Sequence, residues 1–202
     1  MNVRITCPLT FLAGIHYGDE LQMNDYVVKL HILTNSLDGA INNTALDRIK
    51  YFVYHELENT VFINSAYVDQ CARYIDAGMN ITTIPEEPID QLVGIMLFNK
   101  LNAIAEDRII IDEIEISSKL GDGIIYYHNQ DENVDELTIP DWWKSANIVH
   151  CDPELIDTDE IDILANLTIW SDLELAWPGE ISNNDSGNTV VFADFKILDE
   201  TK

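Results

Sequence analysis

The residues best suited to chemistry are five histidines, and their spacing does not form a metal motif. They stand at positions 16, 31, 55, 128 and 150. No two have the H-x-H or H-x-x-x-H spacing that places imidazoles on one face of a strand or a helix. We expect His16 and His31 to meet across the first hairpin, as a cross-strand pair at the rim of a sheet. The sequence therefore predicts no metal site and no cofactor.

Four carboxylates are concentrated in a short segment of the C-terminal part. They are Asp157, Asp159, Glu160 and Asp162, and we call them the acidic cluster. A calcium loop needs an oxygen ligand at its fifth position and glycine at its sixth. This chain has Ile161 at the fifth position and Asp162 at the sixth. Acidic residues near a helix N-terminus, which the helix dipole favours, are the simpler interpretation.

Other catalytic motifs are missing from the sequence. The phosphate-binding patterns G-x-x-x-x-G-K-[ST] and G-x-G-x-x-G do not occur. His150 and Cys151 are neighbours in the sequence, but a nucleophile and its base have to converge in space. We therefore predict no catalytic residue, and the sequence favours a protein that is not an enzyme.

The charge of the chain limits its partners. Its 202 residues include 36 acidic and 11 basic ones, which gives a formal net charge of −25 at pH 7. Direct nucleic-acid binding is excluded, because neutralising phosphates requires Lys and Arg, and binding to anionic membranes is disfavoured for the same reason. No apolar run reaches the roughly 18 residues of a membrane span, and three cysteines do not make a disulfide framework. We expect a soluble protein in the cytoplasm of the producing or infected cell.

Hydrophobic periodicity predicts an α+β fold. Strands are expected at 3–11, 26–33, 108–117 and 124–128, and helices at 44–57, 65–78 and 88–104. Pro8 indicates that the first strand lies at an edge. Two hairpins then flank a helical pair, so the expected product is an antiparallel four-stranded sheet with two long helices on one face.

The charge is uneven along the chain, and this predicts a division into two parts. Residues 1–128 contain 18 acidic and 8 basic residues, whereas residues 129–202 contain 18 acidic and only 3 basic ones. The polar stretch 129–133 is typical of a linker. We expect a folded domain over 1–128 and an acidic α+β extension over 129–202. The extension is expected to contain a short helix at 141–143, a helix at 158–166, and strands at 167–176 and 189–197.

Within residues 3–128, several short motifs occur in an order that resembles one known family. The segment 10–16 (TFLAGIH) is similar to an opening strand with a Phe, small residues and a His. A second strand follows at Met23–Leu30, the first helix ends at 57–59 (LEN), and the next helix begins at 88–92 (PIDQL). This order resembles the tunnelling fold of the 6-pyruvoyl-tetrahydropterin synthase and 6-carboxytetrahydropterin synthase family.

The resemblance implies a chemistry that this chain largely lacks. The family holds a catalytic zinc with three imidazoles, and the matching positions here are His16, Met23 and Asp25. Methionine is a poor zinc ligand, so the set is incomplete. The proton-transferring His of the family is matched by Asn59, which does no acid–base chemistry. Its pterin-anchoring Glu is matched by Ser117, or by Glu115 after a two-residue shift in register. The chain resembles a family member without its chemistry, or a convergent fold that never had it.

We therefore predict a non-catalytic acidic binding or inhibitory protein. Its expected partner is a basic, nucleic-acid-binding protein, since spaced carboxylates can imitate the phosphates of DNA, as in small acidic viral proteins. The expected binding residues are the acidic cluster together with Trp142 and Trp143. For all four tryptophans, core packing is the main interpretation and an interface patch the alternative. One alternative function is a pterin- or purine-binding enzyme with a rearranged site. A second is a structural ring-forming subunit, and in each case a homo-oligomer is expected because tunnelling-fold chains pair their sheet edges.

Overall fold

A long antiparallel hairpin forms the centre of the fold. The computed structural model describes residues 3–34, 38–131, 141–144, 146 and 170–179. Strands β1 (Val3–Tyr17) and β2 (Glu20–Thr34) pair along their whole length, and Gly18 turns the chain with φ +62°. Both strands are longer than the sequence predicts. Residues 20–23 at the hairpin tip are exposed on both faces, so burial there does not follow the polar–apolar alternation of the sequence.

The sheet has six strands in the order β4-β3-β1-β2-β5-β6. The four others are β3 (Val61–Asn64), β4 (Ile81–Ile84), β5 (Ile109–Ser118) and β6 (Tyr126–Asn129). Strands β1, β2, β5 and β6 are antiparallel, as predicted, whereas β3 and β4 run parallel to β1. The prediction of four strands is therefore wrong. Both additional strands are four residues long and almost entirely buried, so they show no polar alternation.

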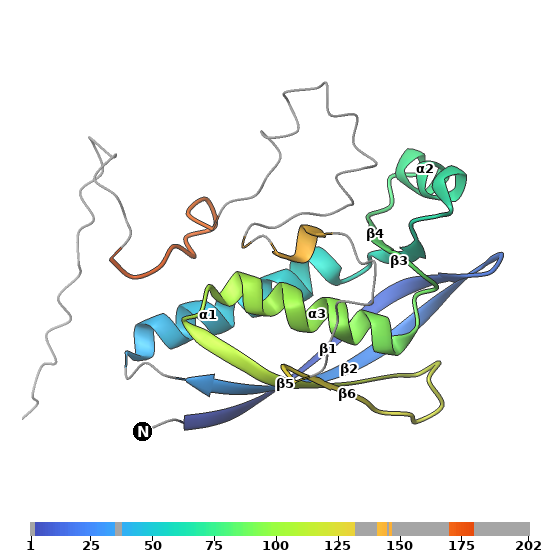
Figure 1. Cartoon of the computed structure of the whole chain (residues 1–202). Helices are drawn as coiled ribbons and strands as arrows, with labels where there is room; N and C mark the ends of the chain where they lie inside the picture. The colour runs from blue at the N-terminus through green and yellow to red at the C-terminus, as the bar shows by residue number, and fades with distance from the viewer. Residues whose placement is uncertain (1–2, 35–37, 132–140, 145, 147–169, 180–202) are drawn as a thin grey trace, which may run out of the picture.

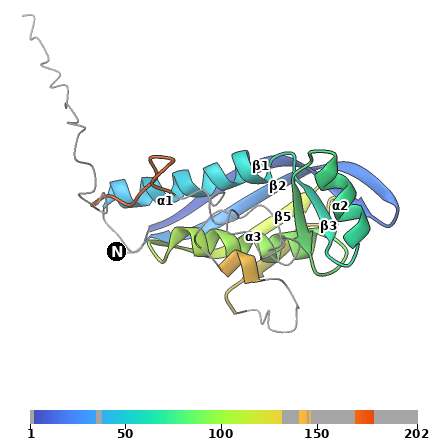
Figure 2. The same cartoon turned by 90° about the horizontal axis from the view of Figure 1, so that it is seen from above.

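Helices cover one face of this sheet. They are α1 (Gly39–Tyr51), continued by the π-helical turn η1 (Phe52–Leu57), then α2 (Val68–Asp76) and α3 (Asp90–Ala105). Figures 1 and 2 show α1 and α3 side by side over β1, β2 and β5, with α2 at the end near β3. The first helix begins before the predicted Thr44, because the Asp38 carboxylate caps it by accepting the Ala40 N–H at 2.9 Å. None of the helices in the described ranges combines the length and apolar character needed to cross a membrane.

The main core lies between this helical layer and the sheet. Alternate residues of β1 and β2, such as Leu9, Phe11, Val28 and Leu30, point into it. Gly94 brings α3 close to β5, since a Cβ at this position would lie 2.7 Å from Cγ2 of Ile116. The opposite face of the sheet carries the intervening side chains, and we call it the open face.

Two pieces of the predicted extension belong to the same core. The short helix η2 (Asp141–Lys144) lies where a short helix was predicted; it packs against α3 and contributes Trp143. The segment 170–179 contributes Trp170 and Trp177, but it forms turns where a strand was predicted up to residue 176. The predicted helix at 158–166 and strand at 189–197 lie outside the described residues. Trp143, Trp170 and Trp177 therefore pack into the core of residues 1–128, and the division into a domain and an extension stays a prediction.

Arg48 holds the segment 170–179 in place. Its guanidinium carbon lies 5.0 Å from the Trp170 ring centroid and 3.9 Å from that of Trp177. Its Nε donates to the Leu175 carbonyl at 2.7 Å, and its Nη1 donates to Glu106 Oε1 at 2.8 Å. The other Glu106 oxygen accepts the Trp177 indole N–H at 2.8 Å. A buried cation therefore links α1 to residues more than a hundred positions away.

Candidate functional site

The positions that match the zinc ligands of the resembled family do not fit a zinc ion. His16 is 5% exposed, and its Nδ1 lies 2.9 Å from the Tyr74 hydroxyl. The rings of Tyr67 and Tyr74 pack edge-on against the imidazole. Met23 is 53% exposed on β2, and Asp25 is exposed as well. Among the described residues, no group of three possible metal ligands includes His16. One imidazole committed to an aromatic cluster does not supply a catalytic zinc centre.

The register of the hairpin keeps His16 and His31 apart. His16 stands opposite Leu21 near the hairpin tip, whereas His31 stands opposite Thr6 near the other end. The predicted pairing of the two histidines is therefore wrong, because β1 and β2 are too long for these positions to meet. His31 Nε2 instead lies 2.9 Å from Glu115 Oε1 and 3.6 Å from Glu113 Oε1.

The remaining matched positions have structural roles. Asn59 adopts φ +65° after η1, and its backbone N–H donates to the Leu12 carbonyl at 2.8 Å. Glu115 accepts a hydrogen bond from Lys29 at 2.9 Å. Hydrogen bonds from Lys29 and His31 lower the pKa of the Glu115 carboxyl. Glu115 is thus engaged on the open face.

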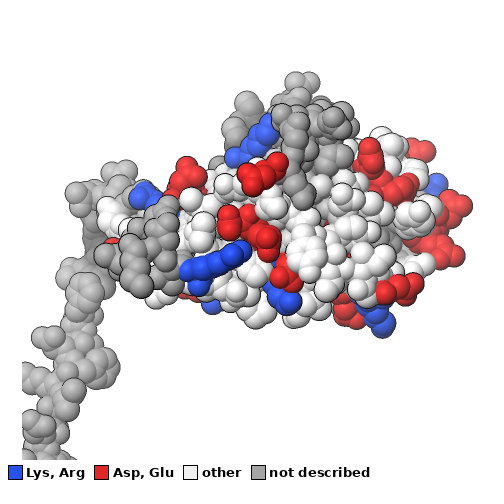
Figure 3. Space-filling model, turned by 60° about the horizontal axis from the view of Figure 1, so that its bottom comes forward, with Lys and Arg blue, Asp and Glu red and all other residues white. Residues whose placement is uncertain are grey.

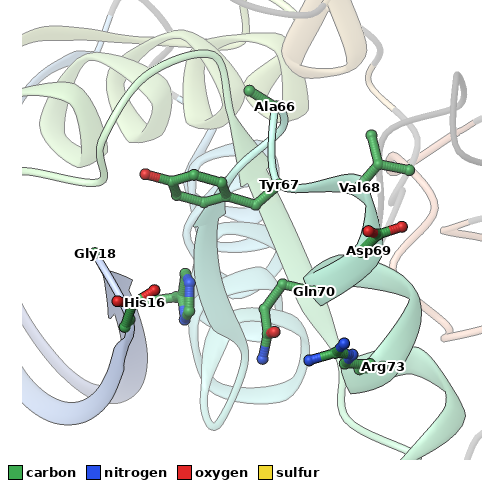
Figure 4. A pocket seen from close by; sticks show the side chains of 9 residues that line it. His16, Gly18, Ala66, Tyr67, Val68, Asp69, Gln70 and Arg73 are labelled. Carbon is green, nitrogen blue, oxygen red and sulfur yellow. The ribbon is translucent and has the colours of Figure 1, made fainter.

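One cavity, of about 430 Å³, lies between the hairpin tip and α2. Figure 4 shows Gln70 between His16 and Arg73, with the Tyr67 ring at the edge of the same space. The Tyr67 hydroxyl donates to Glu87, and this hydrogen bond raises the pKa of the phenol. The cavity is polar and carries both signs of charge, because Asp19 also lines it.

A second cavity, of about 340 Å³, is more unusual because buried polar atoms without hydrogen-bond partners gather at it. Asn24 and Asp90 line it, together with apolar side chains that include Ile15, Ile89 and Leu120. Asn24 Nδ2 and Asp90 Oδ2 make no hydrogen bond, although the two residues are 0 and 7% exposed. Buried polar groups are usually paired, so two orphans at one cavity call for an explanation such as a ligand or water.

The orientation of Asn24 in this cavity follows from its other contact. The backbone N–H of Leu120 donates to Asn24 Oδ1 at 3.0 Å. Since an N–H only donates, the accepting atom is the oxygen, and the amide NH₂ is the group that remains unpaired. The cavity therefore offers a donor from Asn24 and an acceptor from Asp90.

Burial controls the electrostatics of this cavity. It raises the pKa of the Asp90 carboxyl, and hydrogen bonds with Ser118 only partly offset the effect. Burial also raises the pKa of the Tyr26 hydroxyl, the neighbouring Asn24 side chain lowers it in part, and the charge of Asp90 raises it further. Gly121 makes room for the carboxylate, because a Cβ there would lie 2.6 Å from Asp90 Oδ2. The sequence gives one signal for this site, a polar Asn24-x-Tyr26 pair on the strand face that otherwise carries core residues.

The binding residues predicted from the sequence are only partly placed. Trp143 is 7% exposed and belongs to the main core, so a partner does not reach it without opening this packing. The structure thus favours core packing over an interface role for Trp143. The side chain of Trp142 and the whole acidic cluster lie outside the described residues. Trp143 lines neither cavity.

Comparison with known proteins gives only a broad likeness. No family model and no curated protein matches the chain. One similar solved structure is the uncharacterized protein WS1659 from Wolinella succinogenes, with 11% identity and a TM-score of 0.46. Another is a catalytic-residue mutant of 6-pyruvoyltetrahydropterin synthase from Plasmodium vivax, with 12% identity and a TM-score of 0.42. Each comparison covers 64% of this chain and 99% of the other. This likeness is to a mixed α+β, tunnelling-fold-like arrangement, and it carries no argument about the site.

Proposed function

We propose that the chain is a non-catalytic binding protein whose acidic surface engages a basic, nucleic-acid-binding protein. The observation that carries the proposal is the charge: 18 acidic and 3 basic residues in 129–202, within a net charge of −25. This excess is larger than solubility requires and opposes folding through self-repulsion. The misfit of His16, Met23 and Asp25 to zinc supports a role without the chemistry of the resembled family.

The physical basis of such binding is long-range attraction. Carboxylates spaced along a surface present a field similar to that of a phosphate backbone, which attracts the groove of a nucleic-acid-binding protein. Attraction of this kind raises association rates and weakens as the Debye length falls from about 10 Å at 0.1 M salt to about 3 Å at 1 M. Occupying the groove inhibits the partner, as small acidic viral inhibitors do.

The test uses the full chain on a solid support and the heparin-binding fraction of a cell lysate as the probe. We expect proteins to be retained at 0.1 M salt and released both at 1 M salt and by added double-stranded DNA. Retention that DNA does not displace contradicts groove mimicry, and the absence of any retained protein contradicts the proposal as a whole.

A charge-matched pair of variants locates the interaction. In the first, the acidic cluster is neutralised by D157N, D159N, E160Q and D162N. The control neutralises four exposed carboxylates among the described residues, D19N, E20Q, D69N and D76N, and so changes the net charge equally. With a purified retained partner, the first variant is expected to associate more slowly than the control at low salt. Equal rates exclude a specific role for the acidic cluster.

A second candidate function, a pterin- or purine-binding protein with a rearranged site, is favoured by the unpartnered atoms of the second cavity. Asn24 Nδ2 suits a ring carbonyl, and Asp90 Oδ2 suits the adjacent ring N–H. The apolar side chains of Ile15, Ile89 and Leu120 suit the faces of a planar ring. A lactam edge of a pterin or a purine has this pair of groups.

Titration of the chain with neopterin and with guanosine, followed by calorimetry, tests this candidate. Asp90→Asn replaces the acceptor by a donor, and we expect affinity to fall by about tenfold or more, since each 1.4 kcal/mol is a factor of ten. Asp69→Asn at the first cavity is the matched control and should leave binding unchanged. Binding of neither compound to the wild-type chain contradicts this function without affecting the first.

A further inference from the structure

The open face carries a cluster of three possible metal ligands that neither cavity includes. It consists of His31 on β2 with Glu113 and Glu115 on β5, and we call it the histidine–glutamate cluster. One ligand atom from each residue lies within 4.8 Å of the other two. All three side chains are partly exposed. In Figure 3, which brings the lower side of Figure 1 forward, acidic and basic side chains lie side by side on this face.

A β-bulge adjoins the cluster. His31 pairs with Glu113, but the next residue, Ile32, pairs with Ile111, so that Asp112 is the additional residue on β5. Beyond the bulge, alternation places Glu113 and Glu115 on the same face as His31. Asp112 instead pairs with Arg4 at 3.6 Å.

The distances suit a small transition-metal ion. Bonds of about 2.0–2.2 Å from zinc to nitrogen and oxygen imply about 3.3 Å between tetrahedral ligands. His31 Nε2 lies 2.9 Å from Glu115 Oε1 and 3.6 Å from Glu113 Oε1, on either side of this value. Imidazole with carboxylates favours zinc and similar transition-metal ions over calcium and magnesium, which prefer oxygen ligands alone.

A neighbouring cation orients one ligand without occupying its metal-facing atom. Lys29 Nζ donates to Glu115 Oε2 at 2.9 Å, which leaves Oε1 toward His31. Outer contacts of this kind are typical of metal sites. Two carboxylates and one ammonium leave a net charge of −1 around the imidazole. The other residues opposite the cluster are Thr6, Tyr127 and Asn129, and none adds a positive charge.

We propose that His31, Glu113 and Glu115 form a binding site for a divalent transition-metal ion of the zinc class on the open face. Three protein ligands leave a coordination position for water or for a donor from another molecule. The site is separate from the family's zinc position, because His16 lies at the other end of the hairpin. It does not depend on the proposed function.

Calorimetric titration of the chelator-treated full chain with Zn²⁺ tests the proposal, and Co²⁺ absorbance reports the ligand set. We expect one ion per chain. His31→Ala and Glu113→Gln should each weaken the affinity for Zn²⁺ by roughly 10- to 100-fold or more. This is the loss that removal of an outer contact causes at metal sites, and the removal of a ligand should cost at least as much. His55→Ala is the matched control, since this exposed histidine stacks on Tyr51 outside the cluster. Its affinity should equal that of the wild type.

The opposite results are equally clear. If the wild-type chain does not bind Zn²⁺, or if Glu113→Gln binds it with unchanged affinity, the proposal is overturned. The three residues are then an ion-pair network and not a metal site. Loss of binding in His16→Ala but not in His31→Ala places the ion at the family's position instead. Circular dichroism checks that each variant is folded. If His31→Ala fails this check, Glu113→Gln decides alone, because its partly exposed side chain is not needed for packing.

Discussion

Lys100 is buried in the middle of α3 and gives the chain a pH dependence that can be measured. Its side chain is 0% exposed, and its Nζ lies 5.8 Å from the Phe52 ring centroid. Burial lowers the pKa of this ammonium from 10.5 to about 8. Lys100→Met keeps a similar length and removes the titrating group.

The size of the effect follows from the difference between the folded and unfolded pKa values. The difference is roughly 2.5 units, and at 1.36 kcal/mol per unit it corresponds to about 3 kcal/mol. Because the folded pKa is the lower one, this stability is fully present above the unfolded pKa near 10.5. It is lost as the pH falls through the folded value near 8. The wild-type free energy of unfolding should therefore rise with pH relative to that of the variant.

Urea unfolding of both proteins at pH 7 and pH 9.5 measures this difference. Linkage predicts that the wild-type chain gains about 2 kcal/mol relative to Lys100→Met between these two values. Subtracting the variant removes the contribution of the other titrating groups. Lys119→Met, at an exposed position, is the matched control and should show no such change. A wild-type-minus-variant difference that is flat within about 0.5 kcal/mol refutes the reasoning and shows that Lys100 stays charged in the fold.

Three further predictions concern stability and assembly. Asp90→Asn should stabilise the chain at pH 7 by on the order of 1 kcal/mol, with no gain near pH 3. Burial raises the pKa of the Asp90 carboxyl, so its contribution to the stability of the wild type is present below its ordinary pKa and is lost as the pH rises through the folded value. Thermal unfolding of both proteins at the two pH values measures this difference. A variant that is less stable than the wild type at pH 7 contradicts the prediction. Arg48→Met should lower the free energy of unfolding by about 3–5 kcal/mol, because it breaks a buried charge network. It should also make the segment 170–179 sensitive to limited proteolysis. If urea unfolding shows a decrease below about 1 kcal/mol, the two tryptophans hold this segment without the cation. Among the described residues, β1 pairs with β3 only at Gly14 and Ile15, so most of its outer edge is unpaired, as Pro8 predicts; edges of this length are usually covered, so light scattering should show a homo-oligomer, and a monomer of 23.0 kDa would count against ring assembly.

The sequence by itself was enough for the elements whose pattern is local. Alternation in β2 and β5 and the helical spacing in α3 predict elements that the structure confirms, because each of these buries one consistent face. The edge position of Pro8 follows from the missing N–H of proline. Core packing of Trp143 likewise follows from the size and apolar character of its side chain.

Only the tertiary structure decided which distant residues meet. The pairing of β3 and β4 depends on hydrogen bonds to other strands, and short buried strands have no periodic pattern in the sequence. The pairing register of β2 and β5 places Glu113 opposite His31, and the bulge beside this pair returns Ile111 to the core face. The orphaned atoms of Asn24 and Asp90 become visible only when β2 and α3 pack together around one cavity. Local spacing reports which face of its own strand a residue occupies, whereas register and packing are set by contacts between segments far apart in the chain.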